Sequence, residues 1–526
     1  MKWMGENAMM MINGDQDTLD IDLRLRKAAI SSPDRVAIAD SYRSVTWGEL
    51  DKRVNRIARA LLARGVALQD KVALLGSNSA AYVELMLGIL RAGACVVPLS
   101  SYTSVATCAA MVRDCGARLL FASADYAAGA LALAEEMRLG ASDVIRLDDA
   151  ALDEFMSGMA DTPPLVSMSL DHGFNLIYSS GTTGTPKGIL QSRGFRAREA
   201  EVIQNRYKLG GQTRTIVSTP LCSNTTLFLL FSVLACGGSV KVMEKFDAGG
   251  WLTLAEAWRP TDVILVPVQY TRILGQPDFS CFDLSSLLNK FSTSAPLSAA
   301  TKRDILTRWP AGGLTEFYGM TEGGVTCELR AHERLDKLDT VGMPPEYVEL
   351  RIIDDDKVLP QGQVGEIVGR SPTMMSGYYK REQATLDASW FDGEGRRFQR
   401  SGDVGWIDED GFVHLLDRKK DVIISGGFNV YASDLESVIS QHREVADVAV
   451  VAAPSISWGE TPVACVVLRS DVEPEIIRQW ANEKLGKVQR IAMVVVFDEL
   501  PRNQIGKVLK RDLRTWIAEK HGEMLA

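Results

Sequence analysis

A loop rich in glycine, serine and threonine at residues 178–188 has the composition of a phosphate-binding segment. It reads Tyr-Ser-Ser-Gly-Thr-Thr-Gly-Thr-Pro-Lys-Gly and follows an apolar run that is typical of a strand. Successive backbone N–H groups in such a turn form a concave anion site, and Lys187 adds a positive charge. The spacing matches neither a Walker loop nor a dinucleotide fingerprint. The alternative, a flexible linker, does not explain the single lysine and the preceding strand.

Polar residues further along the chain suit a bound nucleotide. Thr321 and Glu322 pair a hydroxyl with a carboxylate, and a carboxylate is the hard oxygen ligand that Mg²⁺ takes beside phosphate oxygens. Asp403 follows a glycine and precedes a strand, where its carboxylate can accept hydrogen bonds from ribose hydroxyls. Lys507 follows Gly506 in a loop before an amphipathic helix. Taken singly, the Thr-Glu pair is as typical of a helix cap as of a nucleotide site. Asp403 taken singly is typical of a turn.

Six segments in a fixed order resemble the motifs of the adenylate-forming superfamily, which includes acyl- and aryl-CoA synthetases, peptide-synthetase adenylation domains and luciferases. The loop at residues 178–188 resembles its phosphate loop. The other five resemble the adenine segment, the Tyr-Gly-x-Thr-Glu signature, the Thr-Gly-Asp motif, the hinge motif and the C-terminal lysine motif; they are residues 292–297, 317–322, 401–403, 417–421 and 501–507. The resemblance runs from about Pro33 to about Arg514, nearly the whole chain.

The resemblance implies a reaction in two steps. A carboxylate attacks the α-phosphate of ATP and pyrophosphate leaves; CoA then takes the acyl group and AMP is released. Lys507 would stabilise the negative charge that builds up in the first step. No general base is needed, because a carboxylic acid is already ionised near pH 7.

The resemblance also assigns roles to individual residues. Tyr318 would stack on adenine, Thr321 would bond the AMP phosphate, and Glu322 would bind the metal. Lys420 is the implied hinge residue, and Ser425, Gly426 and Gly427 would line the pantetheine tunnel for CoA. The implied catalytic residues are Lys507, Thr321, Glu322 and Lys187; the implied ATP-binding residues are Ser179, Ser180, Gly181, Thr182, Thr183, Gly184, Lys187, Ser294, Ala295, Pro296, Glu316, Phe317, Tyr318, Gly319, Met320, Thr321, Asp403, Arg418 and Lys507.

The segment at residues 219–226 departs from the family pattern, which often reads Pro-Leu-Phe/Tyr-His. Cys222 and Ser223 stand at the last two of these positions and are smaller, so we expect a wider acid pocket or gate unless neighbouring side chains compensate. Asn224 is neutral, which disfavours an amino-acid substrate, because a buried ammonium group needs an acidic partner. Candidate pocket residues are Cys222, Ser223, Asn224, Thr225, Val268, Thr293, Phe317, Gly319 and Val325. This mostly uncharged lining favours an aromatic or medium-chain aliphatic acid over a dicarboxylate.

Alternating strands and helices are expected to position these motifs. Apolar runs at residues 71–75 and 94–99 flank a helical pattern at 80–92, which is typical of a parallel α/β unit. Similar short runs recur at 119–122, 143–147, 215–219, 239–243 and 262–267. Closely spaced strands follow from residue 348. We therefore predict an α/β fold: a large N-terminal domain of mixed α/β sheets with a following antiparallel β subdomain (1–419), and a small mobile α+β C-terminal domain (420–526).

Composition excludes several other classes of protein. The net charge of −9 argues against a nucleic-acid binder, and the eight cysteines and five histidines lack metal-site spacing. The most apolar run, residues 227–236, is shorter than the ~18 residues of a membrane span. The first residues lack the apolar core of a signal peptide. We expect a cytoplasmic protein with no nucleic-acid partner, and base rates favour a homodimer.

Three functions compete. The first is an AMP-forming acid–CoA ligase that uses ATP, Mg²⁺ and CoA. The second is a stand-alone adenylating enzyme that passes the acyl group to a carrier protein or an amine. The third, a nucleotide-binding regulatory protein with a degenerate site, is disfavoured by the presence of Lys507, Glu322 and Asp403. We favour the first; the sequence does not identify the acid, the acceptor, the oligomeric state or the resting position of the C-terminal domain.

Overall fold

The computed structural model describes residues 20–100, 103–137, 143–179, 186–425, 428–455, 458–503 and 506–525. The chain divides into two compact units, residues 1–349 with 369–399 and residues 350–368 with 400–526. The domain boundary expected between residues 419 and 420 falls within the second unit and stays a prediction. Among the described residues, no helix has both the length and the apolarity needed to cross a membrane.

The first unit contains a seven-stranded sheet. Its order is β18 (Gly377–Tyr378), β8 (Lys187–Ser192), β7 (Gly173–Ser179), β4 (Cys95–Leu99), β3 (Lys71–Leu75), β5 (Leu119–Ala122) and β6 (Val144–Arg146). The strands from β7 to β6 are parallel, whereas β8 and β18 are antiparallel to their neighbours. The parallel α/β unit expected from residues 71–99 is therefore confirmed.

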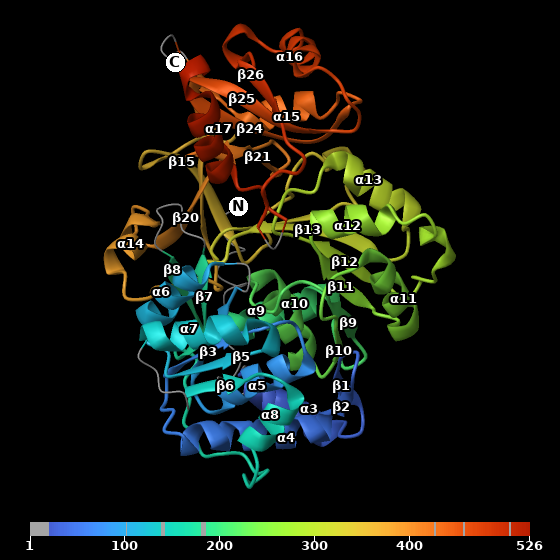
Figure 1. Cartoon of the computed structure of the whole chain (residues 1–526), viewed down its shortest axis with the longest axis vertical. Helices are drawn as coiled ribbons and strands as arrows, with labels where there is room; N and C mark the ends of the chain where they lie inside the picture. The colour runs from blue at the N-terminus through green and yellow to red at the C-terminus, as the bar shows by residue number, and fades with distance from the viewer. Residues whose placement is uncertain are drawn as a thin grey trace. The chain divides into compact units, whose positions relative to one another are not determined.

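Helices cover both faces of this sheet (Figure 1). Val72 and Leu74 of β3 pack into the core shared with α4 (Trp47–Ala63), α5 (Ala80–Arg91) and α8 (Asp149–Phe155). The alternate residues, Ala73 and Leu75, pack against α6 (Val105–Cys115) and α7 (Ala127–Met137). A strand covered on both faces must be apolar along its length, which explains the continuous apolar runs of the sequence.

Two four-stranded sheets complete the main body of the first unit. One has the order β2 (Ser44–Thr46), β1 (Val36–Ala39), β10 (Ser239–Val242) and β9 (Arg214–Val217); the other has the order β11 (Asp262–Leu265), β12 (Asn289–Ser292), β13 (Gly313–Gly319) and β14 (Thr326–Arg330). The remaining elements of this unit are α3 (Ile21–Ser31), α9 (Arg193–Tyr207), α10 (Asn224–Ala235), α11 (Ala248–Trp258), α12 (Pro267–Leu274), α13 (Ala299–Arg308), α14 (Glu382–Asp387) and β19 (Ser389–Phe391). Because β11, β12 and β13 are parallel, the loops that follow them leave the same edge of the sheet.

The second unit begins with antiparallel strands, as expected. Antiparallel pairs are formed by β15 (Glu349–Asp354) with β16 (Lys357–Val358) and by β20 (Arg397–Ile407) with β21 (Val413–Arg418), and β17 (Gly365–Arg370) lies between β15 and β20 in the sheet. A turn in which Gly411 N donates to Asp408 O over 2.9 Å closes the β20–β21 hairpin.

A second sheet in this unit has the order β23 (Phe428–Val430), β22 (Ile423–Ser425), β25 (Gly459–Leu468) and β24 (Val445–Ser455), and β26 (Met493–Val496) also pairs with β25. Helices α15 (Ala432–Ile439) and α16 (Pro474–Asn482) pack on one face, and α17 (Lys510–Leu525) packs on the other. The predicted combination of mixed α/β sheets with a smaller α+β region is confirmed.

Candidate active site

The predicted phosphate loop lies between two antiparallel strands. Ser179 ends β7 and is paired with Lys187, which begins β8. The five residues Ser180, Gly181, Thr182, Thr183 and Gly184 lie outside the described residues. Next to the end of β7, the Tyr178 hydroxyl donates to Asp114 Oδ2 over 2.8 Å, and burial raises the pKa of Tyr178, so this donor keeps its proton. The strand pair therefore fixes both ends of the loop.

The Thr-Glu motif lies in the turn between β13 and β14, beside the strand that carries Lys187. Gln191 of β8 donates from Nε2 to the Thr321 carbonyl over 2.7 Å. Tyr378 of β18 donates from its hydroxyl to Glu322 Oε1 over 2.8 Å, and the Lys187 ammonium lies 5.2 Å from the centre of the Tyr378 ring. The structure thus brings Lys187 and Glu322 together around Tyr378, a residue that the sequence analysis missed.

The segment assigned to adenine follows β12, at the same sheet edge as the Thr-Glu motif. Thr293, Ala295 and Pro296 are half-buried or exposed in this loop, and the hydroxyl of Ser294 contacts the hydroxyl of Thr225. This contact joins a predicted ATP-binding residue to a predicted acid-pocket residue. The strand end beside the loop is also accessible: Tyr318 and Met320 are half-buried and Gly319 is exposed.

Glu316 has a different environment from the other residues assigned to ATP. Its side chain is buried, with Oε2 2.5 Å from Lys302 Nζ and Oε1 accepting from Leu297 N over 2.7 Å. The carboxylate therefore ties the adenine segment to β13 and is already engaged within the protein. The assignment of Glu316 to ATP binding remains a prediction. Because its carboxylate is engaged, a contact with ATP would come most simply from its backbone in β13.

The predicted acid-pocket residues gather near the start of α10. Cys222 and Ser223 lead into this helix, and Asn224 and Thr225 begin it. Val268 is the second residue of α12, which follows β11, and Val325 is buried just before β14. Phe228, one turn after Asn224, packs edge-to-face on Phe317 with ring centroids 5.2 Å apart. An aromatic wall therefore lies beside the polar start of the helix.

A fully buried arginine below this region was not predicted. Arg196 of α9 donates to Asn224 Oδ1 over 2.6 Å and is ion-paired with Glu199 over 2.7 Å. Its helix carries charged residues on every face, so there is no apolar stripe from which the burial of Arg196 could be inferred.

The second unit holds the remaining predicted residues. Asp403 and Arg418 are paired across the β20–β21 hairpin, with Arg418 Nε 2.7 Å from Asp403 Oδ1. The two residues assigned to ribose are therefore neighbours. Lys420 lies in the turn after β21, and Ser425 is buried at the end of β22. Gly426 and Gly427 lie outside the described residues.

Lys507 is held by two hydrogen bonds to Asn503. Lys507 N donates to Asn503 Oδ1 and Asn503 N donates to Lys507 O, each over 2.9 Å. The Lys507 side chain is exposed, yet desolvation by neighbouring protein atoms and the charge of Arg418 lower its pKa to about 8. An anion placed beside this amine would favour its charged form.

The environment of Glu322 is compatible with a role as a magnesium ligand. It is half-buried, and Tyr378 engages only its Oε1 atom. Among the described residues, no group of three or more His, Cys, Asp or Glu side chains could hold a metal by itself. A single carboxylate together with substrate phosphates is the usual arrangement for Mg²⁺ in nucleotide-dependent enzymes.

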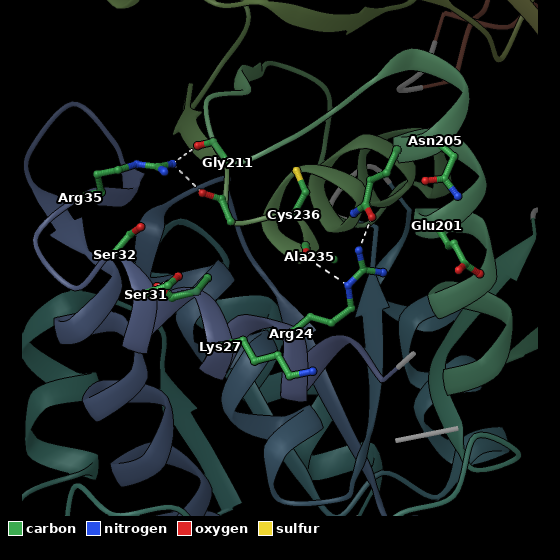
Figure 2. Close-up of a pocket in the computed structure, with 13 residues that line it drawn as sticks. Arg24, Lys27, Ser31, Ser32, Arg35, Glu201, Asn205, Gly211, Ala235 and Cys236 are labelled. Atoms are coloured by element: carbon green, nitrogen blue, oxygen red, sulfur yellow. Dashed lines mark hydrogen bonds between the residues drawn. The ribbon is translucent and has the colours of Figure 1, made fainter. Parts of the chain in front are cut away.

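A separate hollow of about 450 Å³ lies among α3, α9 and α10 (Figure 2). Its arginines are used within the fold: Arg24 donates to the carbonyl of Ala235, and Arg35 donates to the carbonyls of Gly211 and Gly237. Ala235 ends α10, about 16 Å along the helix from Asn224 at 1.5 Å per residue. This hollow is therefore distinct from the predicted acid pocket.

Comparison with known proteins gives matches over both units. The family model of AMP-binding enzymes matches residues 25–379, and that of the AMP-binding enzyme C-terminal domain matches residues 434–507. A feruloyl-CoA synthase from Amycolatopsis sp is 33% identical over 501 residues, which cover 93% of this chain and 97% of the relative. An indoleacetate–CoA ligase from Aromatoleum aromaticum is 30% identical over 508 residues, covering 93% and 96%. ATP-bound MatB from Rhodopseudomonas palustris superposes with a TM-score of 0.87 at 27% identity, covering 97% of this chain and 100% of that chain.

Proposed function

Because this chain belongs to the family of AMP-binding enzymes, we propose that it is an AMP-forming ligase that joins an aromatic carboxylic acid to CoA. The observation that carries the proposal is the similarity to CoA ligases over 93% of the chain, which spans both units. The enzyme is thus an acid–thiol ligase, and ATP and CoA are its co-substrates.

In the proposed first step, the substrate carboxylate attacks the α-phosphate and pyrophosphate leaves. Lys187 and the phosphate loop would hold the departing phosphates, and Thr321 would donate to the α-phosphate. Lys507 would lie against the phosphate and leaving-group oxygens, where negative charge increases in the transition state. Asp403 and Arg418 would hold the ribose. Mg²⁺, held by Glu322, would neutralise phosphate charge.

The aromatic character of the acid is supported by the surroundings of α10. Phe228 lies four residues after Asn224 and so shares its face of the helix. Phe228 packs edge-to-face on Phe317 and is half-buried. The aromatic ring of a substrate could therefore pack beside these two rings. The two relatives described above are named for feruloyl and indoleacetate groups, both aromatic.

A pyrophosphate-release screen tests the proposal. Benzoic, cinnamic and arylacetic acids would be compared with aliphatic acids of four to ten carbons, with and without CoA, and acyl-CoA would be identified by mass spectrometry. We expect the best aromatic acid to exceed the best aliphatic acid at least ~10-fold in kcat/KM, and full turnover to require CoA. A preference for aliphatic acids would contradict the aromatic assignment, and full turnover without CoA would favour a stand-alone adenylating enzyme.

The contact between Tyr378 and Glu322 gives a test of the magnesium assignment. Tyr378→Phe removes a hydrogen bond to a carboxylate, and such bonds to charged groups contribute ~1.5 kcal/mol or more, or about 10-fold in binding. We therefore expect the Kd of ATP in the presence of Mg²⁺ to rise about 10-fold in titration calorimetry, and the Kd measured in EDTA to stay unchanged. Tyr379→Phe, at the adjacent tyrosine, is the matched control. Equal weakening with and without Mg²⁺ would refute the role of Glu322.

We also propose a cytoplasmic location. ATP and CoA are substrates of the intracellular space, and all eight cysteines are free thiols, as is usual under reducing conditions. A homodimer remains the expected assembly on base rates alone.

A further inference from the structure

The buried Arg196 is the centre of a hydrogen-bond network between α9, the phosphate-loop strands and α10. Its Nε donates to Asn175 Oδ1 over 2.9 Å, and its Nη1 donates to Glu199 Oε2 over 2.7 Å. Its Nη2 donates to Gln191 Oε1 and to Asn224 Oδ1, each over 2.6 Å. A buried cation is tolerated only where such partners surround it. The network is therefore a hydrogen-bonded support with Asn224 at its edge.

This support determines the orientation of the Asn224 amide. A guanidinium group only donates hydrogen bonds, so the amide atom facing Arg196 must be the oxygen. Gln191 Nε2 also donates to that oxygen, over 3.3 Å, and to the Thr321 carbonyl over 2.7 Å. The two N–H groups of Asn224 Nδ2 consequently point away from the network. They have no hydrogen-bond partner among the described residues, and Asn224 is half-buried rather than enclosed.

We propose that Asn224 is a specificity-determining residue, which donates a hydrogen bond from Nδ2 to an oxygen substituent on the ring of the acid substrate. The inference rests on the proposed function and names the substrate class: an aromatic acid that carries a methoxy, hydroxyl or other acceptor oxygen. Phe228, on the same face of α10, would contact the ring, and Asn224 would donate the hydrogen bond to its oxygen substituent. A ring without an oxygen substituent would leave the Asn224 Nδ2 donor without a hydrogen bond, so unsubstituted acids are disfavoured.

The test compares three substituents at each ring position of one aromatic acid, and two of them, methoxy and ethyl, are of similar size. A methoxy group only accepts hydrogen bonds, an ethyl group neither accepts nor donates, and an aromatic amino group chiefly donates. We expect the unmodified enzyme to prefer the methoxy acid over the ethyl acid about 10-fold in kcat/KM at one ring position. Asn224→Asp keeps an acceptor for Arg196 but removes the donor. This variant should abolish the preference for methoxy over ethyl. It should also raise the kcat/KM of the aromatic acid with the amino substituent relative to the other two acids.

Asn205→Asp, at an exposed position of α9, is the matched control, and thermal denaturation verifies that both variants are folded. An equal loss of kcat/KM for methoxy and ethyl acids in Asn224→Asp would overturn the inference, because the residue would then act on a part common to all acids. An unchanged methoxy-to-ethyl ratio would overturn it as well. Failure of the unmodified enzyme to activate any ring-bearing acid would instead contradict the proposed function, and this inference with it.

Discussion

Replacing Lys507 with alanine should slow acyl-adenylate formation about 1,000-fold and leave thioester formation from supplied acyl-adenylate within about threefold of the unmodified enzyme. Charge on the phosphate and leaving oxygens increases only in the first step, so a lysine that stabilises it affects that step alone. Rapid-quench measurement of pyrophosphate release and of acyl-CoA formation from synthetic acyl-adenylate separates the two rates.

Lys487→Ala is the control for this experiment, because Lys487 is an exposed lysine of the same unit with no assigned role. Equal loss of both half-reactions in Lys507→Ala would indicate a structural role. The backbone N–H and carbonyl groups of Lys507 are both bonded to Asn503, and alanine retains these groups. Residue 507 is therefore expected to keep its two hydrogen bonds to Asn503 in the variant.

Replacing Lys420 with proline should produce the opposite pattern. Lys420 lies in a turn where Lys419 N donates to Gly402 O over 2.9 Å and Asp421 N donates to Arg418 O over 2.8 Å. Proline keeps these two bonds but fixes φ near −65°, so the backbone rotation expected of a hinge is blocked. Misplacement of reacting groups by ~1 Å costs about 100-fold, and we expect a loss of that size in the thioester step.

Lys420→Ala is the matched control for the proline variant, since it removes the same side chain and leaves the backbone free to rotate. Both half-reactions are measured as for Lys507. Should adenylation fall in Lys420→Pro while the thioester step is preserved, the hinge would have to lie elsewhere in the chain.

The sequence predicted those parts of the fold whose signal is local. The strands at residues 71–75 and 119–122 have the bounds expected from their apolar runs, because helices cover both faces of their sheet. Asp403 and Arg418 belong to neighbouring strands of one hairpin, so motif order alone placed both in the same region. Strand β8 was not expected, since only the apolar run before the phosphate loop had been recognised as a strand.

The missed residues depend on contacts between distant parts of the chain. Tyr378 meets Glu322 from 56 residues away, and it does so because β18 pairs with β8 at the edge of the sheet. Arg196 looks like a solvated charge in the sequence, yet it is fully buried. Its burial is stable only because Asn175, Gln191 and Asn224 come from three other elements to meet it. No local pattern encodes such a convergence.

The most direct test of the central claim, that the acid is activated as an acyl-adenylate, is the fate of the carboxylate oxygen. The enzyme would be supplied with an aromatic acid labelled with ¹⁸O in both carboxylate oxygens, together with ATP, Mg²⁺ and CoA, and the products would be analysed by mass spectrometry. Attack on the α-phosphate followed by transfer to the thiol predicts one ¹⁸O atom in AMP and none in pyrophosphate. Label in inorganic phosphate, with ADP as the nucleotide product, would contradict the account.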